Sequence, residues 1–272
     1  MNLLSLATIK DLLSKHQARP SKGLGQNFLI DEKTLNTIIE TANLSSKDTV
    51  LEVGPGIGTL TQELAKKAGK VIAIEKDSTM VEILKETLKD FKNVEIIQGN
   101  ALKFNYSLLT THYKLVANIP YYLTSPLIRQ LLESENQPSE IILMVQKEVA
   151  QRICATVPDM SLLAVAVQFY AKPEIISYVS KNCFWPAPKV DSAIIKITPL
   201  KETRGCRTPA SFFEIAKAGF SQPRKQLANN LSKTLKKPKK ETDAWILKNG
   251  ISPTQRAQTL TIENWIDLTE SY

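Results

Sequence analysis

Short apolar runs alternate with helical patterns along the first two-thirds of the chain. The run 49–53 leads directly into three glycines, after which apolar residues recur at helical spacing from Leu60 to Ala68. Six further strand-like runs follow, at residues 70–75, 94–98, 115–117, 141–145, 175–179 and 192–197. Seven strands with intervening helices predict an α/β fold built on a single seven-stranded sheet.

A second, smaller unit is indicated after Pro199, where only short helical patterns remain. These patterns cover residues 211–220, 224–235 and 261–269. A chain of 272 residues is long enough for one large and one small domain. We therefore predict a sheet domain over residues 1–200 and a helical domain over residues 208–272, joined by a linker at 201–208.

The N-terminal segment is predicted to be an amphipathic helix rather than a signal peptide. Apolar side chains recur at helical spacing in the first 13 residues, but Lys10 and Asp11 interrupt them and no small-residue cleavage site follows. Residues 16–30 then predict an ordered loop that leads to a helix capped near Asp31.

Four successive strands end in glycine, amide or carboxylate residues. In strand order, these residues are Gly54, Gly56 and Gly58, then Glu75, then Asn100, which Ala101 follows, and finally Asn118. In an open α/β sheet, ligands bind at the carboxyl ends of the strands. Glycine turns also occur without ligands, and an acid after a strand often only caps a helix. The joint occurrence of these features favours a ligand site.

The spacing of the glycines indicates which kind of ligand binds. A dinucleotide-binding fingerprint needs its third glycine at position 59, where this chain has Thr59, and the observed pattern is GxGxG preceded by Glu52. This pattern suits a nucleoside that carries an amino acid and has no pyrophosphate. Glu75 lies about 20 residues beyond the glycines, where a carboxylate can accept both ribose hydroxyl hydrogens.

The stretch Asn118-Ile119-Pro120-Tyr121 predicts a clamp for an amino group on a flat ring. Asn118 offers a side-chain carbonyl oxygen, the Ile119–Pro120 link a backbone carbonyl of fixed geometry, and Tyr121 an aromatic face. The alternative is a strand that ends in a proline turn. Phe184, in the proline-stiffened loop 182–191, is a candidate for the second face of a flipped base, and the alternative is that it caps the core.

The composition argues against several other classes of protein. The three cysteines are widely separated, so neither a disulfide framework nor a zinc site is indicated, and a reducing cytoplasm fits. The two histidines have no partner in a familiar catalytic spacing. No apolar run approaches the roughly 18 residues of a membrane span.

Positive charge is concentrated in one block, which we call the basic block. Residues 196–240 contain 12 lysines and arginines against two glutamates, a local balance of +10, so the rest of a chain with net charge +8 is close to neutral at −2. Such a block is typical of a surface that tracks a phosphate backbone, and the alternative is a solvated face.

Seven separated motifs resemble the small-subunit (16S) ribosomal RNA adenine N6,N6-dimethyltransferase family. They are LGQNFL (24–29), LEVGPGIGTLT (51–61), Glu75, NIPY (118–121), QKEVAQRI (146–153), FWPAPKVDSAI (184–194) and RKQLANNL (224–231). The resemblance covers nearly the whole chain. It implies a Rossmann-like class I methyltransferase domain with a small C-terminal RNA-binding domain.

The resemblance also implies a ligand and a set of site residues. The methyl donor would be S-adenosyl-L-methionine, and the expected donor-binding positions are Asn27, Leu29, Gly54, Gly56, Glu75, Asn100, Ala101 and Asn118. Asn118, Pro120, Tyr121 and Phe184 would hold the target adenine. Two departures stand out: position 100 is usually Asp in this family, and the segment 155–163 lacks the usual glycine- and tyrosine-containing loop.

The expected reaction is direct in-line transfer to adenine N6, twice on each of two adjacent adenines in the 3′-terminal hairpin of 16S rRNA. Neither a metal nor a covalent intermediate is needed, because the donor is already activated. We expect a cytoplasmic monomer that acts on 16S rRNA, the small ribosomal subunit or its precursor. Two alternatives remain open: a large-subunit rRNA adenine dimethyltransferase, and a non-catalytic ribosome-assembly or transcription factor on the same fold. DNA adenine methylation is disfavoured, because that class usually carries NPPY or DPPY.

Overall fold

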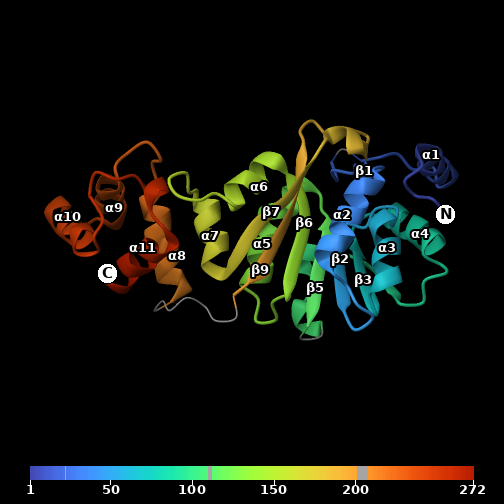
Figure 1. Ribbon diagram of the computed structural model, residues 1–272, viewed down its shortest axis with the longest axis horizontal. Coiled ribbons are helices and arrows are strands. Elements are labelled where there is room, and N and C mark those ends of the chain that lie inside the picture. The colour runs from blue at the N-terminus through green and yellow to red at the C-terminus, as the bar shows by residue number, and fades with distance from the viewer. Residues whose placement is uncertain (22, 110–111, 201–207) are drawn as a thin grey trace. The chain divides into compact units, whose positions relative to one another are not determined.

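The sheet predicted from the hydrophobic pattern is present. The computed structural model describes residues 1–21, 23–109, 112–200 and 208–272. Seven strands form one sheet in the order β4-β3-β2-β5-β6-β9-β7 (Figure 1). They are β2 (Thr49–Val53), β3 (Lys70–Glu75), β4 (Val94–Gln98), β5 (Tyr113–Asn118), β6 (Glu140–Gln146), β7 (Ala171–Val179) and β9 (Ser192–Pro199). The strands from β4 to β6 run parallel, and β9 returns antiparallel to β6.

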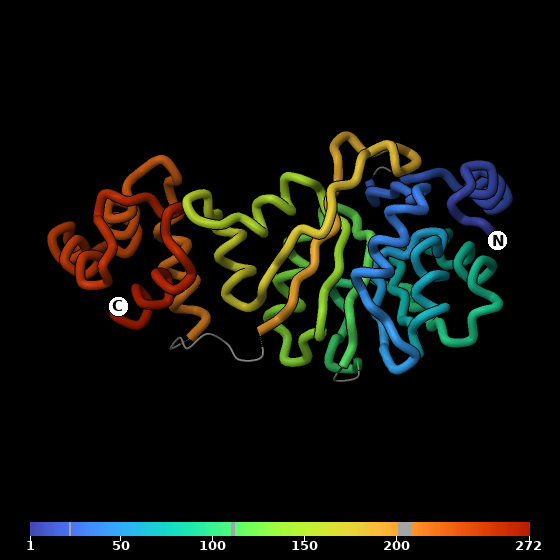
Figure 2. The backbone as a smooth tube through the Cα atoms, in the orientation of Figure 1, coloured from blue at the N-terminus to red at the C-terminus, as the bar shows by residue number. Residues whose placement is uncertain are grey.

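Helices and short 3₁₀ turns precede or connect the parallel strands, along the chain path traced in Figure 2. They are α1 (Leu6–Lys15), α2 (Glu32–Ala42), α3 (Thr59–Lys67), α4 (Ser78–Thr87), α5 (Thr124–Leu132) and α6 (Lys147–Ile153), with short 3₁₀ turns η1 (Ala101–Lys103), η2 (Tyr106–Leu108), η3 (Tyr121–Leu123) and η4 (Lys181–Cys183). The predicted cap of α2 is confirmed, because the Asp31 carboxylate accepts the Thr34 N–H at 2.8 Å.

One face of the sheet is covered by α2 and α3. Leu35 and Ile38 of α2 and Leu64 of α3 share a buried apolar cluster with Val116 of β5 and Ile142 of β6. Each such side chain contributes roughly 1.5–3 kcal/mol by leaving water. This packing fixes the sheet beneath the edge where the strand ends carry polar residues.

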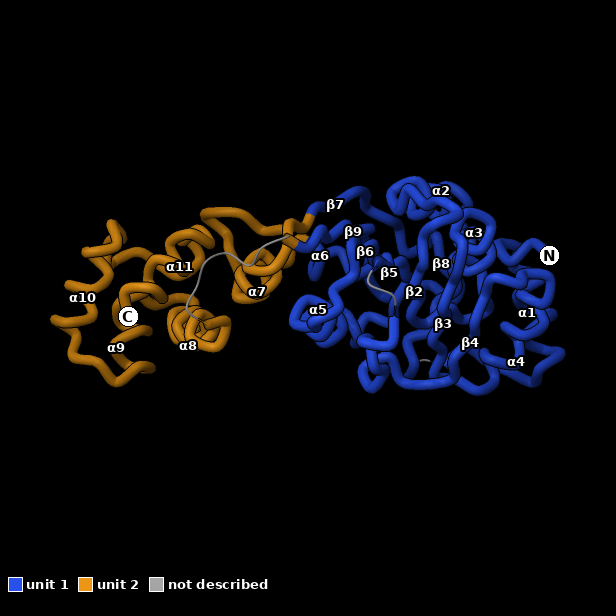
Figure 3. Tube along the Cα trace, turned by 90° about the horizontal axis from the view of Figure 1, so that it is seen from below, with its two compact units in different colours: residues 1–150, 174–199 blue, residues 151–173, 200–272 orange. Residues whose placement is uncertain are grey.

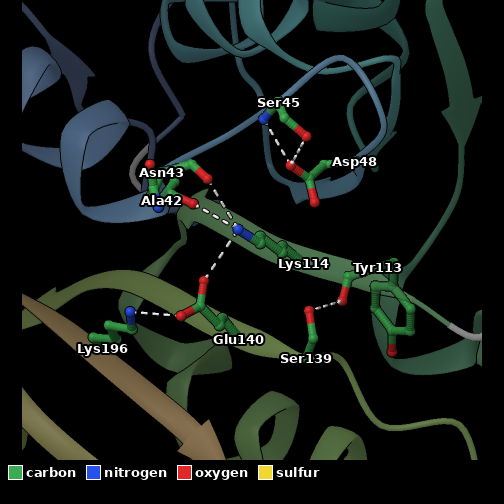
Figure 4. Close-up of polar contacts among 9 residues, drawn as sticks. All are labelled: Ala42, Asn43, Ser45, Asp48, Tyr113, Lys114, Ser139, Glu140 and Lys196. Atoms are coloured by element: carbon green, nitrogen blue, oxygen red, sulfur yellow. Dashed lines mark hydrogen bonds and ion pairs between the residues drawn. The ribbon is translucent and has the colours of Figure 1, made fainter.

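At the opposite edge, a partly buried ion cluster ties α2 to three strands (Figure 4). The Lys114 ammonium donates to the backbone carbonyls of Ala42 and Asn43, at 3.0 and 3.1 Å, and lies 3.2 Å from the Glu140 carboxylate. Glu140 also pairs with Lys196 at 2.5 Å. Because the last carbonyls of a helix have no partner within the helix, Lys114 satisfies two of them while its charge is neutralised.

The chain divides into two compact units, coloured separately in Figure 3. The first contains residues 1–150 and 174–199, and the second contains 151–173 and 200–272. The second unit therefore includes residues 151–173, which the sequence pattern had placed in the sheet domain. Most of the predicted linker, with Cys206, lies outside the described residues.

The second unit is helical and has an aromatic core. Its helices are α7 (Leu162–Tyr170), α8 (Pro209–Gly219), α9 (Leu227–Leu235), α10 (Lys239–Lys248) and α11 (Ile262–Glu270), with one 3₁₀ turn, η5 (Ala257–Thr259). The rings of Phe169 on α7 and Phe212 on α8 stack at 4.1 Å between centroids, which explains why the segment 151–173 belongs here. The helix α10 was not among the predicted elements.

Within the described ranges, no helix combines the length and the apolar character needed to cross a bilayer.

Candidate active site

The carboxyl ends of the parallel strands open into one pocket. The segment 24–29 and the two-residue strand β8 (Phe184–Trp185) complete its wall, because β1 (Phe28–Leu29) pairs antiparallel with β8 and places Leu29 opposite Phe184. All the predicted site residues line this pocket: Asn27, Leu29, Gly54, Gly56, Glu75, Asn100, Ala101, Asn118, Pro120, Tyr121 and Phe184.

Pro120 is packed between two glycines. A Cβ on Gly54, whose φ is +70°, would lie 3.1 Å from Pro120 Cδ, and a Cβ on Gly25, whose φ is +64°, would lie 3.3 Å from Pro120 Cβ. Both positions therefore combine a left-handed backbone with a close approach that only glycine accepts easily. Through these contacts three motifs that are distant in sequence meet around one ring.

Glu75 is buried at the end of β3 and is held by backbone donors. Its carboxylate accepts the Gly56 N–H at 3.1 Å and the Asp77 N–H at 2.9 Å. Burial raises the pKa of Glu75 above its ordinary value, and these hydrogen bonds oppose that shift. Two N–H donors leave part of the lone-pair capacity of the carboxylate for hydroxyl groups of a ligand.

Glu52 is a second buried carboxyl group in the pocket wall, with only 1% of its surface exposed. Burial raises its pKa to about 8, the negative charge of Glu75 adds to this shift, and the nearby Thr61 hydroxyl opposes it. Among the described residues, neither Glu52 Oε2 nor Thr61 Oγ1 has a hydrogen-bond partner of good geometry. Near neutral pH the buried Glu52 carboxyl is therefore held mainly in its neutral form.

The three predicted asparagines differ in how far their side chains are already engaged. Asn100 caps η1, since its Oδ1 accepts the Leu102 N–H at 3.0 Å. Asn27 donates its amide N–H to the Gly25 carbonyl at 3.1 Å, which leaves its oxygen free to accept. Asn118 ends β5 in the pocket wall, and its side chain makes no hydrogen bond to another residue in the described part of the chain.

Tyr121 and Phe184 are fixed in different ways. The Tyr121 hydroxyl forms a 2.7 Å hydrogen bond with Ser192 Oγ, which orients the ring at the pocket wall, and burial raises the pKa of this phenol. Phe184 is 3% exposed and belongs to the same apolar cluster as α2 and α3. It therefore serves the core while also lining the pocket.

Sequence reasoning missed several residues in the pocket wall. Gln26 and Phe28 stand within the LGQNFL motif, Tyr122 follows Tyr121, and Glu52 was noted only as an acid ahead of the glycines. Gln26 bridges two segments, because its amide donates to Asp77 at 2.8 Å. Asp77 lies 51 positions further along the chain, and no sequence pattern indicates that pairing.

The pocket fits a cationic nucleoside derivative such as S-adenosylmethionine. Glu75 can accept hydroxyl hydrogens, and the glycines leave space that a Cβ would fill, as at Gly56, where it would lie 3.4 Å from the Phe28 ring. Within residues 1–21, 23–109, 112–200 and 208–272, no cluster of three or more His, Cys, Asp or Glu could hold a metal ion.

Comparison with known proteins agrees with this geometry. A family profile described as "Ribosomal RNA adenine dimethylase" matches residues 16–272. The chain is 44% identical over 264 residues to the ribosomal RNA small subunit methyltransferase A of Dehalococcoides mccartyi. The match covers 96% of this chain and 91% of that protein. It is 42% identical over 267 residues to the protein of the same name from Clostridium botulinum, with coverage of 96% and 97%.

Two crystal structures share the fold over most of their length. The 23S rRNA methyltransferase ErmE superposes with a TM-score of 0.74 at 28% identity, covering 90% of this chain and 99% of that one. A dimethyladenosine transferase from Plasmodium falciparum gives a TM-score of 0.74 at 29% identity, with coverage of 88% and 95%. The chain therefore belongs to the ribosomal RNA adenine dimethylase family and is an S-adenosylmethionine-dependent rRNA adenine dimethyltransferase.

Proposed function

We propose that this protein dimethylates N6 of two adjacent adenines in the 3′-terminal hairpin of small-subunit (16S) rRNA, in the cytoplasm, as a step of small-subunit biogenesis. The observation that carries the proposal is the convergence of Asn118, Pro120 and Tyr121 on the pocket that also contains Glu75. The relatives at 41–44% identity are named for the small subunit, which supports that choice of substrate. In this proposal the protein acts as a monomer.

Asn118 and the Ile119 backbone hold the amino group of the target. S-adenosylmethionine, when bound, supplies a methyl group that is already activated on a sulfonium. The lone pair of an exocyclic aromatic amine is delocalised into its ring, so acceptors for both N6 hydrogens favour a tetrahedral nitrogen. The unengaged Oδ1 of Asn118 and the Ile119 carbonyl are those acceptors. Such positioning supplies as much as roughly 7–11 kcal/mol in well-oriented reactions.

Tyr121 orients the flipped adenine by stacking. The far end of its ring is held at the pocket wall, because the hydroxyl is hydrogen-bonded to Ser192 at 2.7 Å. Phe184 lines the same pocket and offers an edge or face on another side of the base. The adenine has to leave its stack to reach this site, as in other enzymes that modify bases.

The second unit provides the RNA-docking surface in this proposal. Lys217, Arg224, Lys225, Lys233, Lys236, Lys239 and Lys240 are all exposed. Lys196, which the sequence count included in the basic block, is instead paired with Glu140 in the sheet and does not belong to this surface. Lys201, Arg204 and Arg207 lie outside the described residues. The alternative docking region at 19–22 includes residue 22, which is not described either.

Large-subunit rRNA is the second candidate substrate, because the fold is shared with ErmE at a TM-score of 0.74. Identity to that protein is 28%, against 44% to a small-subunit enzyme. A purely non-catalytic assembly factor would not need an unengaged Asn118 beside a ligand pocket, although a role in assembly is compatible with catalysis.

The test is methyl transfer by an Asn118→Ala variant to small ribosomal subunits under single-turnover conditions. Removing one preorganised group at a reacting centre costs roughly 10²–10³-fold in rate, so we expect a loss of that order with donor affinity changed far less. Asn105→Ala, an exposed asparagine that caps η2, is the matched control and should transfer normally. An Asn118→Ala variant with the wild-type rate would remove Asn118 from the mechanism.

A further inference from the structure

An exposed aromatic residue with a cation above it lies in the sheet unit, outside the residues that line the pocket. Tyr178, near the end of edge strand β7, is 55% exposed, and the ammonium of the exposed Lys147 is 5.0 Å from its ring centroid. A tyrosine this exposed contributes little to the core, because burial is the main source of its stabilisation. Its ring is instead presented to solvent next to a positive charge.

This pair is joined to the adenine site through a short chain of hydrogen bonds. The backbone N–H of Lys147 donates to the backbone carbonyl of Asp191 at 3.0 Å. The next residue, Ser192, forms a 2.7 Å hydrogen bond with the Tyr121 hydroxyl through its side chain. Ser192 pairs with Gln146, the last residue of β6 and the neighbour of Lys147. The ring that is proposed to stack on the target and the Tyr178–Lys147 pair are thus held by the same strand ends.

We propose that Tyr178 and Lys147 form a platform for the nucleotide next to the target adenine, an inference that rests on the proposed function. When one of two adjacent adenines is flipped into the pocket, its neighbour loses a stacking partner and needs another surface. An exposed aromatic ring stacks any base on the face that Lys147 does not cover, and the Lys147 ammonium attracts the adjoining phosphate. The platform would then hold each adenine in turn while the other is methylated.

The chemistry of the pair favours RNA over a protein partner. Ile176 precedes Tyr178 on the same exposed face of β7 at 37% exposure, so the apolar surface is small. The lysines at 147, 181 and 189 are all exposed in the segments that follow β6 and β7. Glu148, Glu174 and Asp191 are exposed in the same region, so what favours RNA is the contact of the Lys147 ammonium with the exposed Tyr178 ring.

The test compares Tyr178→Ala, Tyr178→Phe and Ile176→Ala on reconstituted small-subunit particles. Stacking on an aromatic side chain is worth roughly 1–3 kcal/mol per base, so Tyr178→Ala should lose roughly 5- to 150-fold in kcat/KM. Tyr178→Phe keeps the ring and should stay near wild type, as should Ile176→Ala, which alters the same strand face without removing a ring. S-adenosylmethionine affinity should be unchanged in all three variants.

Particles in which the neighbouring adenine is replaced by an abasic nucleotide make the test specific. On these particles the wild-type protein should already show the loss in kcat/KM that Tyr178→Ala shows on unmodified particles. Tyr178→Ala should lower kcat/KM no further, because the two changes remove the same contact. Equal losses for Tyr178→Ala with and without the neighbouring base would overturn the platform and indicate contact with another part of the particle. A wild type that does not methylate small-subunit particles would overturn the proposed function itself, whereas normal methylation by Tyr178→Ala would overturn the platform alone.

Discussion

Replacing Glu52 by Gln should remove a large part of the pH dependence of folding in the donor-free protein. The carboxyl is fully buried in the pocket wall, and its pKa is about 8 in the folded protein against 4.5 for an ordinary glutamate. The folded chain therefore keeps a proton on Glu52 between about pH 4.5 and pH 8, where the unfolded chain has lost it. Glutamine has the same shape and no charge, so Glu52→Gln imitates the protonated form at every pH.

The sign and the size of the effect follow from proton linkage. Because the folded state binds more protons in this window, the free energy of unfolding falls as pH rises, by up to about 1.4 kcal/mol per pH unit. Over the interval from 4.5 to 8 the loss is at most about 5 kcal/mol. The raised pKa of Glu75 acts in the same direction and persists in the variant, so the difference between the two curves isolates Glu52.

The measurement is urea unfolding of donor-free protein at pH 5, 6, 7 and 8. Wild type should become steadily less stable over this range, and Glu52→Gln should be more stable than wild type at pH 8, with a much flatter profile. Glu82→Gln, at a surface carboxylate paired with Lys85, should follow the wild type. A wild-type curve that stays level or rises from pH 5 to pH 8 would refute the reasoning, as would a Glu52→Gln curve parallel to it.

Four further changes test other parts of the structure. Gly54→Ala places a methyl group 3.1 Å from Pro120 at a φ of +70°, so it should cost roughly 1–3 kcal/mol of stability by thermal unfolding and weaken donor binding by calorimetry. Asn100→Asp keeps the η1 cap and adds negative charge toward a cationic donor, so calorimetry should show equal or tighter binding; clearly weaker binding would contradict this. Lys114→Met removes the bonds to the end of α2 and should lower the free energy of unfolding by roughly 1.5–3 kcal/mol without changing kcat. A fourfold alanine variant of basic residues of the second unit should weaken RNA binding and flatten its salt dependence by roughly 0.7–0.9 in log-log slope per lost contact, with donor affinity unchanged. The residues are the exposed Arg224, Lys225 and Lys236, and the half-buried Lys237.

The sheet could be predicted because its strands are apolar runs bounded by glycines and helical patterns, and all seven are present. The ends of the strands were harder to predict where partly buried charged residues form ion pairs. The apolar run 115–117 belongs to the longer strand Tyr113–Asn118, which includes Lys114, and β6 begins at its partner Glu140. A hydrophobic pattern treats such residues as exposed, since the pairing that allows their burial is not local in sequence.

The residues at the C-terminal ends of the strands could be predicted to share one site, because parallel strands place those ends at the same edge of the sheet. What could not be predicted depends on contacts between distant segments. The pairing of Phe28 with Trp185 joins residues more than 150 positions apart, and the stack of Phe169 on Phe212 places the segment 151–173 in the second unit. Likewise, the burial of Glu52 depends on α3 and the pocket wall, which the local pattern around it does not specify.

The central claim is tested most directly by mapping N6,N6-dimethyladenosine in both rRNAs of cells with and without this protein. We predict that two adjacent dimethyladenosines in the 3′-terminal hairpin of small-subunit rRNA disappear without the protein, return with the wild type, and do not return with Asn118→Ala. Loss of a modified adenine from large-subunit rRNA alone, or an unchanged pattern in both rRNAs, would contradict the account.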